Sequence, residues 1–184
     1  VTAGQHVAVR LEYDAQGRET RRVFDLNGTL STLTQYWTGV DQLERRLLTE
    51  GEGEGGPLLR DESYYYDPRG RLEEYLCEGP QSPVDPYGKT LVGQRFFFDA
   101  LDNHEEVKTY FGPDPRADVN TATFEYDPQD PVQLRRINNS HADYPPVVEL
   151  SYDANGNLLQ DEAGRTLSYD SLGRLDSVGA PSGS

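Results

Sequence analysis

The stretch Tyr152-Asp153-Ala154-Asn155-Gly156-Asn157-Leu158 decides the fold, because its pattern recurs as Tyr66 to Leu72 and as Tyr169 to Leu175. An Asp at the first position of a type I turn can accept hydrogen bonds from backbone amides two residues on. A Gly three positions later supplies the left-handed conformation that completes the turn with a G1 bulge. Each copy therefore predicts a β-hairpin turn, in which the aromatic residue ends the incoming strand.

Further copies of the aromatic–Asp pair extend the repeat along the chain. They occur at Tyr13-Asp14, Phe24-Asp25, Phe98-Asp99 and Tyr126-Asp127, and Asp161 with Gly164 repeats the spacing without the aromatic. Asp102 and Asp130 replace Gly in two copies, which predicts turns of altered geometry or irregular connections there. The residues to which the pattern assigns a structural role are Tyr13, Asp14, Gly17, Tyr66, Asp67, Gly70, Tyr152, Asp153, Gly156, Tyr169, Asp170 and Gly173.

The segments between the turns alternate apolar and polar residues, as strands with one covered face do. Val7, Val9, Leu11 and Tyr13 are an example. A single hairpin cannot bury such a face, so consecutive hairpins are expected to form a continuous aromatic and aliphatic layer in an all-β fold. Two departures are predicted: a short helix near 41–48, where Asp41 and Glu44 fit a capping box, and a mobile acidic loop over 49–57.

Composition narrows the function classes. The formal net charge is −15, and an acidic surface repels phosphate, so nucleic acids are unfavourable partners. Apolar residues make up only 35% of the chain while Tyr alone contributes 12 residues, which predicts a thin core. Cys77 is the single cysteine and is interpreted as a small buried hydrophobe. No apolar run is long enough to span a bilayer, and the lack of methionine leads us to expect a piece of a longer chain.

No catalytic or metal site is predicted. The prominent Asp residues recur with the repeat, and a repeated residue has a repeated structural task, so turn formation is favoured over acid–base chemistry. The alternation Asp153, Asn155, Asn157 offers oxygen ligands for calcium, but Leu158 stands where an EF-hand-like loop would require Gly. The three histidines lack ligand spacing. We therefore expect neither an enzyme nor a cofactor.

A binding surface is the alternative to a purely structural role. Rings that pack on sugar faces beside polar groups that bind hydroxyls are typical of carbohydrate sites. Trp37, Tyr64 and Tyr65 are the candidate glycan-binding residues, with Tyr66 and Tyr75 nearby. The competing interpretation is that these rings alternate between the sheet core and a solvated face.

The quoted motifs resemble the Rhs/YD-repeat family, whose signature is similar to Tyr-Asp-x-x-Gly-Arg/Asn-Leu. The resemblance runs from about Leu11 to Val178, and the segment Leu59 to Lys89 looks most like the C component of bacterial insecticidal ABC toxin complexes. The resemblance implies consecutive YD-repeat β-hairpins in a curved or spiralling sheet that forms part of a hollow shell. The autoprotease core of the bacterial members is not found, so no catalytic residue is carried over.

The same resemblance implies a function. Residues 1–178 would be a YD/Rhs-repeat segment of a larger protein, and 179–184 would be a flexible tail. The segment would help to encapsulate a toxin or effector polypeptide in a bacterial protein that is secreted or displayed at the cell surface. Its partners would be the remaining shell of the same polypeptide, a partner toxin-complex subunit and the enclosed cargo, with glycans as the alternative ligand. Neither nucleic acid nor a membrane span is expected.

Overall fold

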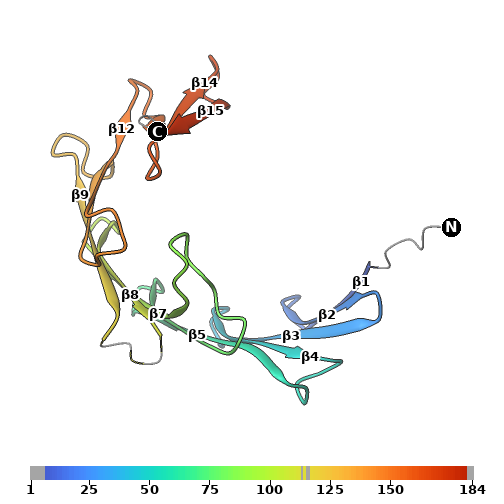
Figure 1. The fold of residues 1–184 in the computed structure, drawn as a ribbon. Coiled ribbons are helices and arrows are strands. Elements are labelled where there is room, and N and C mark those ends of the chain that lie inside the picture. Colours follow the sequence, from blue (N-terminus) through green and yellow to red (C-terminus); the bar gives the residue numbers. More distant parts are fainter. Residues whose placement is uncertain (1–6, 113, 115–116, 182–184) are drawn as a thin grey trace. The chain divides into compact units, whose positions relative to one another are not determined.

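A computed structural model describes residues 7–112, 114 and 117–181, and every regular element within them is a β-strand (Figure 1). The strands pair in antiparallel fashion, and each strand's hydrogen-bonded neighbour in its sheet is its neighbour in sequence. The strands are β1 Val7–Tyr13, β2 Glu19–Leu26, β3 Thr29–Trp37, β4 Leu43–Glu50, β5 Leu58–Tyr66, β6 Leu72–Glu78, β7 Leu91–Phe98, β8 His104–Phe111, β9 Val119–Tyr126, β10 Leu134–Asn139, β11 Val147–Glu149, β12 Ser151–Tyr152, β13 Leu158–Gln160, β14 Arg165–Tyr169 and β15 Leu175–Pro181.

The chain divides into two compact units. The first comprises Val1–Phe96 and Thr109–Val119, and the second comprises Phe97–Lys108 and Asn120–Ser184. In the first unit β1 to β7 form successive hairpins, and in the second β9 to β11 pair in order while β12 to β15 form a four-stranded sheet. The all-β fold of consecutive hairpins that the repeat predicts is thus confirmed.

The core is thin and includes polar residues. Its buried apolar side chains are Val23, Leu33, Leu59, Tyr75, Cys77, Phe111 and Val148. In the middle of β3, Thr32, Leu33 and Thr34 are buried in succession, so this strand is covered on both faces. Period-2 alternation alone would have left one face of β3 open to solvent.

The loop that follows β4 supplies part of that cover. The Thr32 hydroxyl donates to the Gly51 carbonyl and accepts from the Gly53 amide, both at 2.8 Å. The Thr49 hydroxyl donates to the Gly53 carbonyl at 2.7 Å, and the Tyr36 hydroxyl donates to Glu54 at 2.7 Å. The acidic glycine-rich loop is therefore held against β3 and β4 by hydrogen bonds, where the composition had predicted a mobile segment.

The helix predicted near 41–48 is wrong. Asp41 has a φ of 63°, the left-handed region, which a helical N-terminus does not adopt, and β4 begins two residues later. Leu47 pairs with Thr34 of β3 and with Asp61 of β5. Sheet partners on both sides therefore satisfy the backbone of β4, and this tertiary pairing outweighs the local capping-box pattern.

The last residues that the structure describes continue the sheet. Strand β15 runs to Pro181, so residues 179–181 of the predicted tail lie in a strand, and 182–184 lie outside the described residues. Within the described residues there is no helix with the length and apolar character needed to cross a membrane.

Candidate functional site: the repeated turns and the face between them

Most of the motif Asp residues close their own turn with the carboxylate. At Asp67, Oδ1 accepts from the amides of Arg69 and Arg71, both at 2.9 Å, and the Gly70 amide donates to the Asp67 carbonyl at 2.9 Å. Gly70 has a φ of 83°, as the G1 bulge requires. The same arrangement recurs at Asp14, Asp85, Asp99, Asp153, Asp161 and Asp170.

The residue after the turn Gly is a second partner of the carboxylate. The Nε of Arg71 donates to Asp67 Oδ2 at 2.7 Å, and Arg18, Arg165 and Arg174 bind their own motif Asp in the same way. Asn157 replaces the guanidinium with its amide, 2.9 Å from Asp153 Oδ2. We call this arrangement the carboxylate clasp. In it, one Asp binds two backbone amides and the side chain of the residue four positions later. The Arg or Asn at this position is visible in the sequence motif, but the motif does not show that its side chain binds the Asp carboxylate.

The clasp makes the carboxylates more acidic. At Asp153 the Asn157 side chain, followed by the amides of Asn157 and Asn155, lowers the pKa below its usual value. At Asp170 the amide and side chain of Arg174 lower the pKa in the same way. These oxygens are occupied by donors of their own turn, so the calcium alternative at Asp153 gains no support. Among the described residues no group of three His, Cys, Asp or Glu side chains could hold a metal ion.

In three copies of the motif the Tyr hydroxyl connects one motif turn to the previous one. The Tyr66 hydroxyl donates to the Leu43 carbonyl at 2.9 Å, where Leu43 opens the strand after the preceding turn. Tyr126 donates to the His104 carbonyl at 3.0 Å, and Tyr152 donates to the Leu134 carbonyl at 2.7 Å. In all three bonds the acceptor is the carbonyl of the first residue in the strand that follows the preceding motif turn. We call such a bond, from the motif ring to the carbonyl that opens the strand after the preceding turn, an aromatic rung.

Trp37 belongs to this series, although no Asp follows it. Its indole N–H donates to the Glu19 carbonyl at 2.9 Å, and Glu19 opens the strand after the Asp14 turn. The hydroxyl of Thr38 accepts from the amides of Val40 and Gln42 as a motif Asp does. Asp41 takes the left-handed position of Gly. Trp37 to Leu43 is therefore a degenerate copy of the motif that sequence reasoning missed, in the segment where it predicted a helix.

Two other copies depart from the pattern. Asn27 and Gly28 have φ values of 56° and 86°, so a two-residue hairpin connects β2 and β3, and Asp25 lies inside β2 instead of starting the turn. The turn at Asp127 is longer than in the regular copies: the Asp127 amide donates to the carbonyl of Gln133, six residues on, whereas the Asp67 amide donates to Arg71, four residues on. By contrast, Asp99 keeps the clasp with Asp102 at a φ of 68°. Of the two copies in which Asp replaces Gly, one is regular and one is not.

The candidate glycan-binding residues do not form one surface. Tyr64 and Tyr65 are consecutive in β5, so their side chains point to opposite faces. Tyr64 is half-buried against Tyr75, with ring centroids 5.5 Å apart, while Tyr65 is half-exposed. The Trp37 ring forms the aromatic rung described above, and the Arg18 guanidinium lies 5.8 Å from its centroid.

One face of β4 to β6 holds a buried carboxylate. Glu62 is only 6% exposed, and it accepts from the Tyr75 hydroxyl at 2.9 Å. Arg60 and Arg46 approach its Oε2 to 3.3 Å and 3.7 Å. Burial, then hydrogen bonds with Cys77 and Glu62, raise the pKa of Tyr75, so this hydroxyl stays protonated and serves as a donor. The cluster is charge-paired internally, which indicates a structural task.

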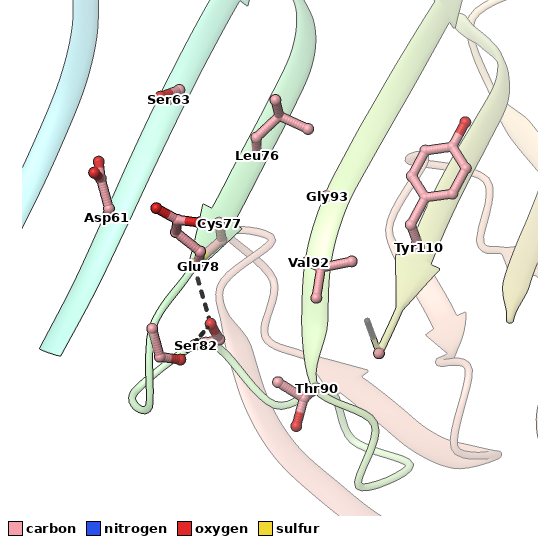
Figure 2. A pocket seen from close by; sticks show the side chains of 12 residues that line it. Asp61, Ser63, Leu76, Cys77, Glu78, Ser82, Thr90, Val92, Gly93 and Tyr110 are labelled. Atoms are coloured by element: carbon pink, nitrogen blue, oxygen red, sulfur yellow. Dashed lines mark hydrogen bonds between the residues drawn. The ribbon is translucent and has the colours of Figure 1, made fainter. Parts of the chain in front are cut away.

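The opposite face carries an open pocket of about 660 Å³ (Figure 2). Its floor and walls come from four strands, β5 to β8, and from the loop after β6. Leu76, Val92 and Tyr110 supply apolar surface, and Asp61 and Glu78 supply carboxylates. Cys77 is buried at its edge, with its thiol 3.6 Å from the Ser82 hydroxyl.

Comparison with known proteins identifies the fold only. No protein-family model and no curated protein sequence matches the chain. It is similar to part of the crystal structure of TcdB2-TccC3 and to part of the Photorhabdus luminescens Tc holotoxin pore structure, each with a TM-score of 0.55 and 14% identity. Both matches cover 96% of this chain, but only 12% and 11% of the solved chains. The chain thus has the fold of a short stretch of proteins from Tc toxin assemblies.

Proposed function

We propose that this chain is a structural YD-repeat stretch of a β shell that encapsulates a toxin or effector polypeptide in a secreted bacterial toxin. Its partners would be the remaining shell of the same polypeptide, a partner toxin-complex subunit and the enclosed cargo. Such a stretch has no catalytic role, because enclosure depends on continuity of the wall and not on one reactive group.

The observation that carries this proposal is the series of aromatic rungs. Each rung ties a hairpin to the one before it through a backbone carbonyl, and each carboxylate clasp fixes the turn beside it. The motif residues are therefore used to extend a strip of hairpins. The likeness in fold to stretches of Tc toxin structures supports the same proposal.

The alternatives receive less support. Hydrolysis would need converging carboxylates free to act on a substrate, whereas the motif Asp residues are engaged by their own turns. A carbohydrate-binding module would need its rings on one accessible surface, whereas Trp37 is committed to a rung, and Tyr64 and Tyr65 lie on opposite faces.

Limited proteolysis of the full parent polypeptide tests the proposal, with mass spectrometry to follow the segment downstream of this one. Protection of that segment until the repeats unfold is the expected result. The parent carrying Gly156→Val should lose protection at a lower temperature, whereas Gly39→Val, at a glycine without a positive φ, should not. Immediate digestion of the downstream segment while the repeats stay intact would rule out enclosure, and a glycan-binding screen would follow.

A further inference from the structure

Strand β1 is the first strand of the eleven-stranded sheet, and within the part of the chain that the structure describes no strand pairs with its outer edge (Figure 1). Its seven residues are all exposed. Val7, Val9, Leu11 and Tyr13 share one face, by the alternation of a strand, and are 62%, 52%, 41% and 57% exposed. A long, apolar edge with unpaired backbone groups is a template for another strand.

Tyr13 lacks the partner that its place in the motif predicts. Trp37, Tyr66 and Tyr126 each form an aromatic rung with the carbonyl that opens the preceding strand of the sheet. For Tyr13 this preceding strand would lie on the free edge of β1, and among the described residues no hydrogen bond engages its hydroxyl. The edge therefore presents a rung donor without an acceptor.

Strand β15 presents the matching acceptor. It is the last strand of the four-stranded sheet, and no strand of the described residues pairs with its outer edge. Leu175 opens β15 directly after the Asp170 turn, as Glu19 opens β2 after its own motif turn, and the Glu19 carbonyl is a rung acceptor. Tyr169, which follows the three-residue β13, forms no rung among the described residues, but β15 has seven residues, the length of β1.

The rungs also define a register. Continuing the pairing of β4 with β5 places the acceptor Leu43 opposite Tyr65, one residue before the donor Tyr66. Continuing the pairing of β2 with β3 gives the same offset, since Glu19 lies opposite the residue before Trp37. A rung between two strands therefore fixes which residues face each other along both of them.

Applied to the two free edges, this offset places Leu175 opposite Glu12. Two apolar pairs follow along an antiparallel ladder: Val178 lies opposite Val9, and Ala180 lies opposite Val7. Val178 is 48% exposed, so both members of its pair are open to solvent in the single chain. The edges are thus complementary in length, in direction and in apolar side chains.

We propose that copies of this chain associate head to tail through these edges, with β1 of one copy pairing antiparallel with β15 of a second copy. The Tyr13 hydroxyl donates to the Leu175 carbonyl of the second copy and forms an aromatic rung between chains. Because the two edges are different surfaces, each contact leaves one free β1 and one free β15, so further copies can add. The association is independent of whether the strip of hairpins encloses a cargo.

Analytical ultracentrifugation of the full 184-residue chain, from micromolar to millimolar concentration, tests the association. Val9→Lys places a charge on the edge of β1, and Val132→Lys is its matched control, because it makes the same change at an exposed residue between β9 and β10. Tyr13→Phe removes only the rung hydroxyl, and Tyr65→Phe makes the same change at a half-exposed ring away from both edges. Thermal midpoints of dilute samples establish that each variant folds.

The mass of the parent is expected to rise with concentration, and the two control variants should follow it. Tyr13→Phe should weaken the association by about twofold to tenfold, as loss of one hydrogen bond implies, and Val9→Lys should weaken it by about tenfold or more. A parent that stays monomeric throughout, or an association that Val9→Lys leaves unchanged or that Val132→Lys weakens equally, would overturn the proposal.

Disulfide formation between two variants tests the register. Val9→Cys mixed with Val178→Cys should form a cross-linked pair of chains under mild oxidation, since the two positions face each other across the new ladder. Ser177→Cys is the matched control, because its side chain points to the other face of β15 and should not link to Val9→Cys. Equal cross-linking of Val9→Cys to itself or to Ser177→Cys would show that the copies do not meet in this register.

Discussion

The Tyr66 hydroxyl and the Leu43 carbonyl, 2.9 Å apart, join two successive turns of the sheet. The link is a side chain on one hairpin and a backbone group on the one before it. It explains why Tyr66, and likewise Tyr126 and Tyr152, are Tyr where burial alone would be met by Phe, since only the hydroxyl can reach and satisfy the carbonyl.

Tyr66→Phe should therefore destabilise the first unit by about 0.5–1.5 kcal/mol, the usual value of one hydrogen bond. Tyr65→Phe is the matched control, because it makes the same change at the neighbouring ring, which is half-exposed. Chemical denaturation of both variants measures the difference. An equal loss of unfolding free energy in the two variants would show that the hydrogen bond of the rung does not stabilise the fold.

Gly156→Val should destabilise the second unit through backbone strain. Gly156 has a φ of 83°, and nothing lies within 4 Å of a Cβ built there, so steric clash with neighbours is not involved. The left-handed conformation costs an L-residue roughly 1–2 kcal/mol, and more when it is β-branched. Gly156→Asn should cost less, because Asn tolerates this region. Calorimetric midpoints that place Asn at or below Val would contradict this explanation.

Acid should weaken the second unit through Asp153. Its folded pKa lies below the usual value of 3.8, so its stabilisation is complete above that value and is lost as pH falls through the folded pKa. Asp153→Asn should flatten the decline in thermal midpoint below about pH 4, where the parent's clasp is being protonated. A variant whose midpoint follows pH as steeply as the parent's would show that the clasp carries no net charge effect.

A second pH dependence, at higher pH, is expected from His104. Burial lowers its pKa below 6.5, and its ring centroid lies 4.7 Å from that of Phe98 and 5.8 Å from that of Phe124. A depressed folded pKa means that the unfolded chain binds the proton more tightly, so stability falls as pH decreases below about 6.5. Denaturation between pH 7.5 and pH 5 should show this decline in the parent and a flatter profile in His104→Gln.

The sequence predicted the fold well because turn chemistry is local. An Asp at one position and a Gly three residues later contain enough information to specify a hairpin, as Asp67 with Gly70 illustrates. At Asp102 the sequence left open a turn of altered geometry or an irregular connection. The turn persists with the regular pattern, since an Asp can take the left-handed position when the clasp around Asp99 is intact.

What the sequence could not show depends on contacts between distant residues. The aromatic rungs join residues 18 to 23 positions apart, and only their ring end is visible in a motif. Trp37 was a candidate for sugar binding because the sequence does not show that its indole N–H is already bound to a backbone carbonyl. The capping-box pattern of Asp41 and Glu44 suggested a helix for the same reason, since the partners of Leu47 and Leu48 in β3 and β5 are not adjacent to them in sequence.

The acceptors of the aromatic rungs belong to a Glu, two Leu and a His, yet the bond is the same, because it uses the peptide group that every residue carries. Neighbouring hairpins therefore need not co-evolve in order to remain joined. A gene that duplicates, deletes or exchanges one such unit keeps its junctions intact at once. This property makes the strip a modular scaffold, whose length can change by recombination while the faces of the individual units diverge freely.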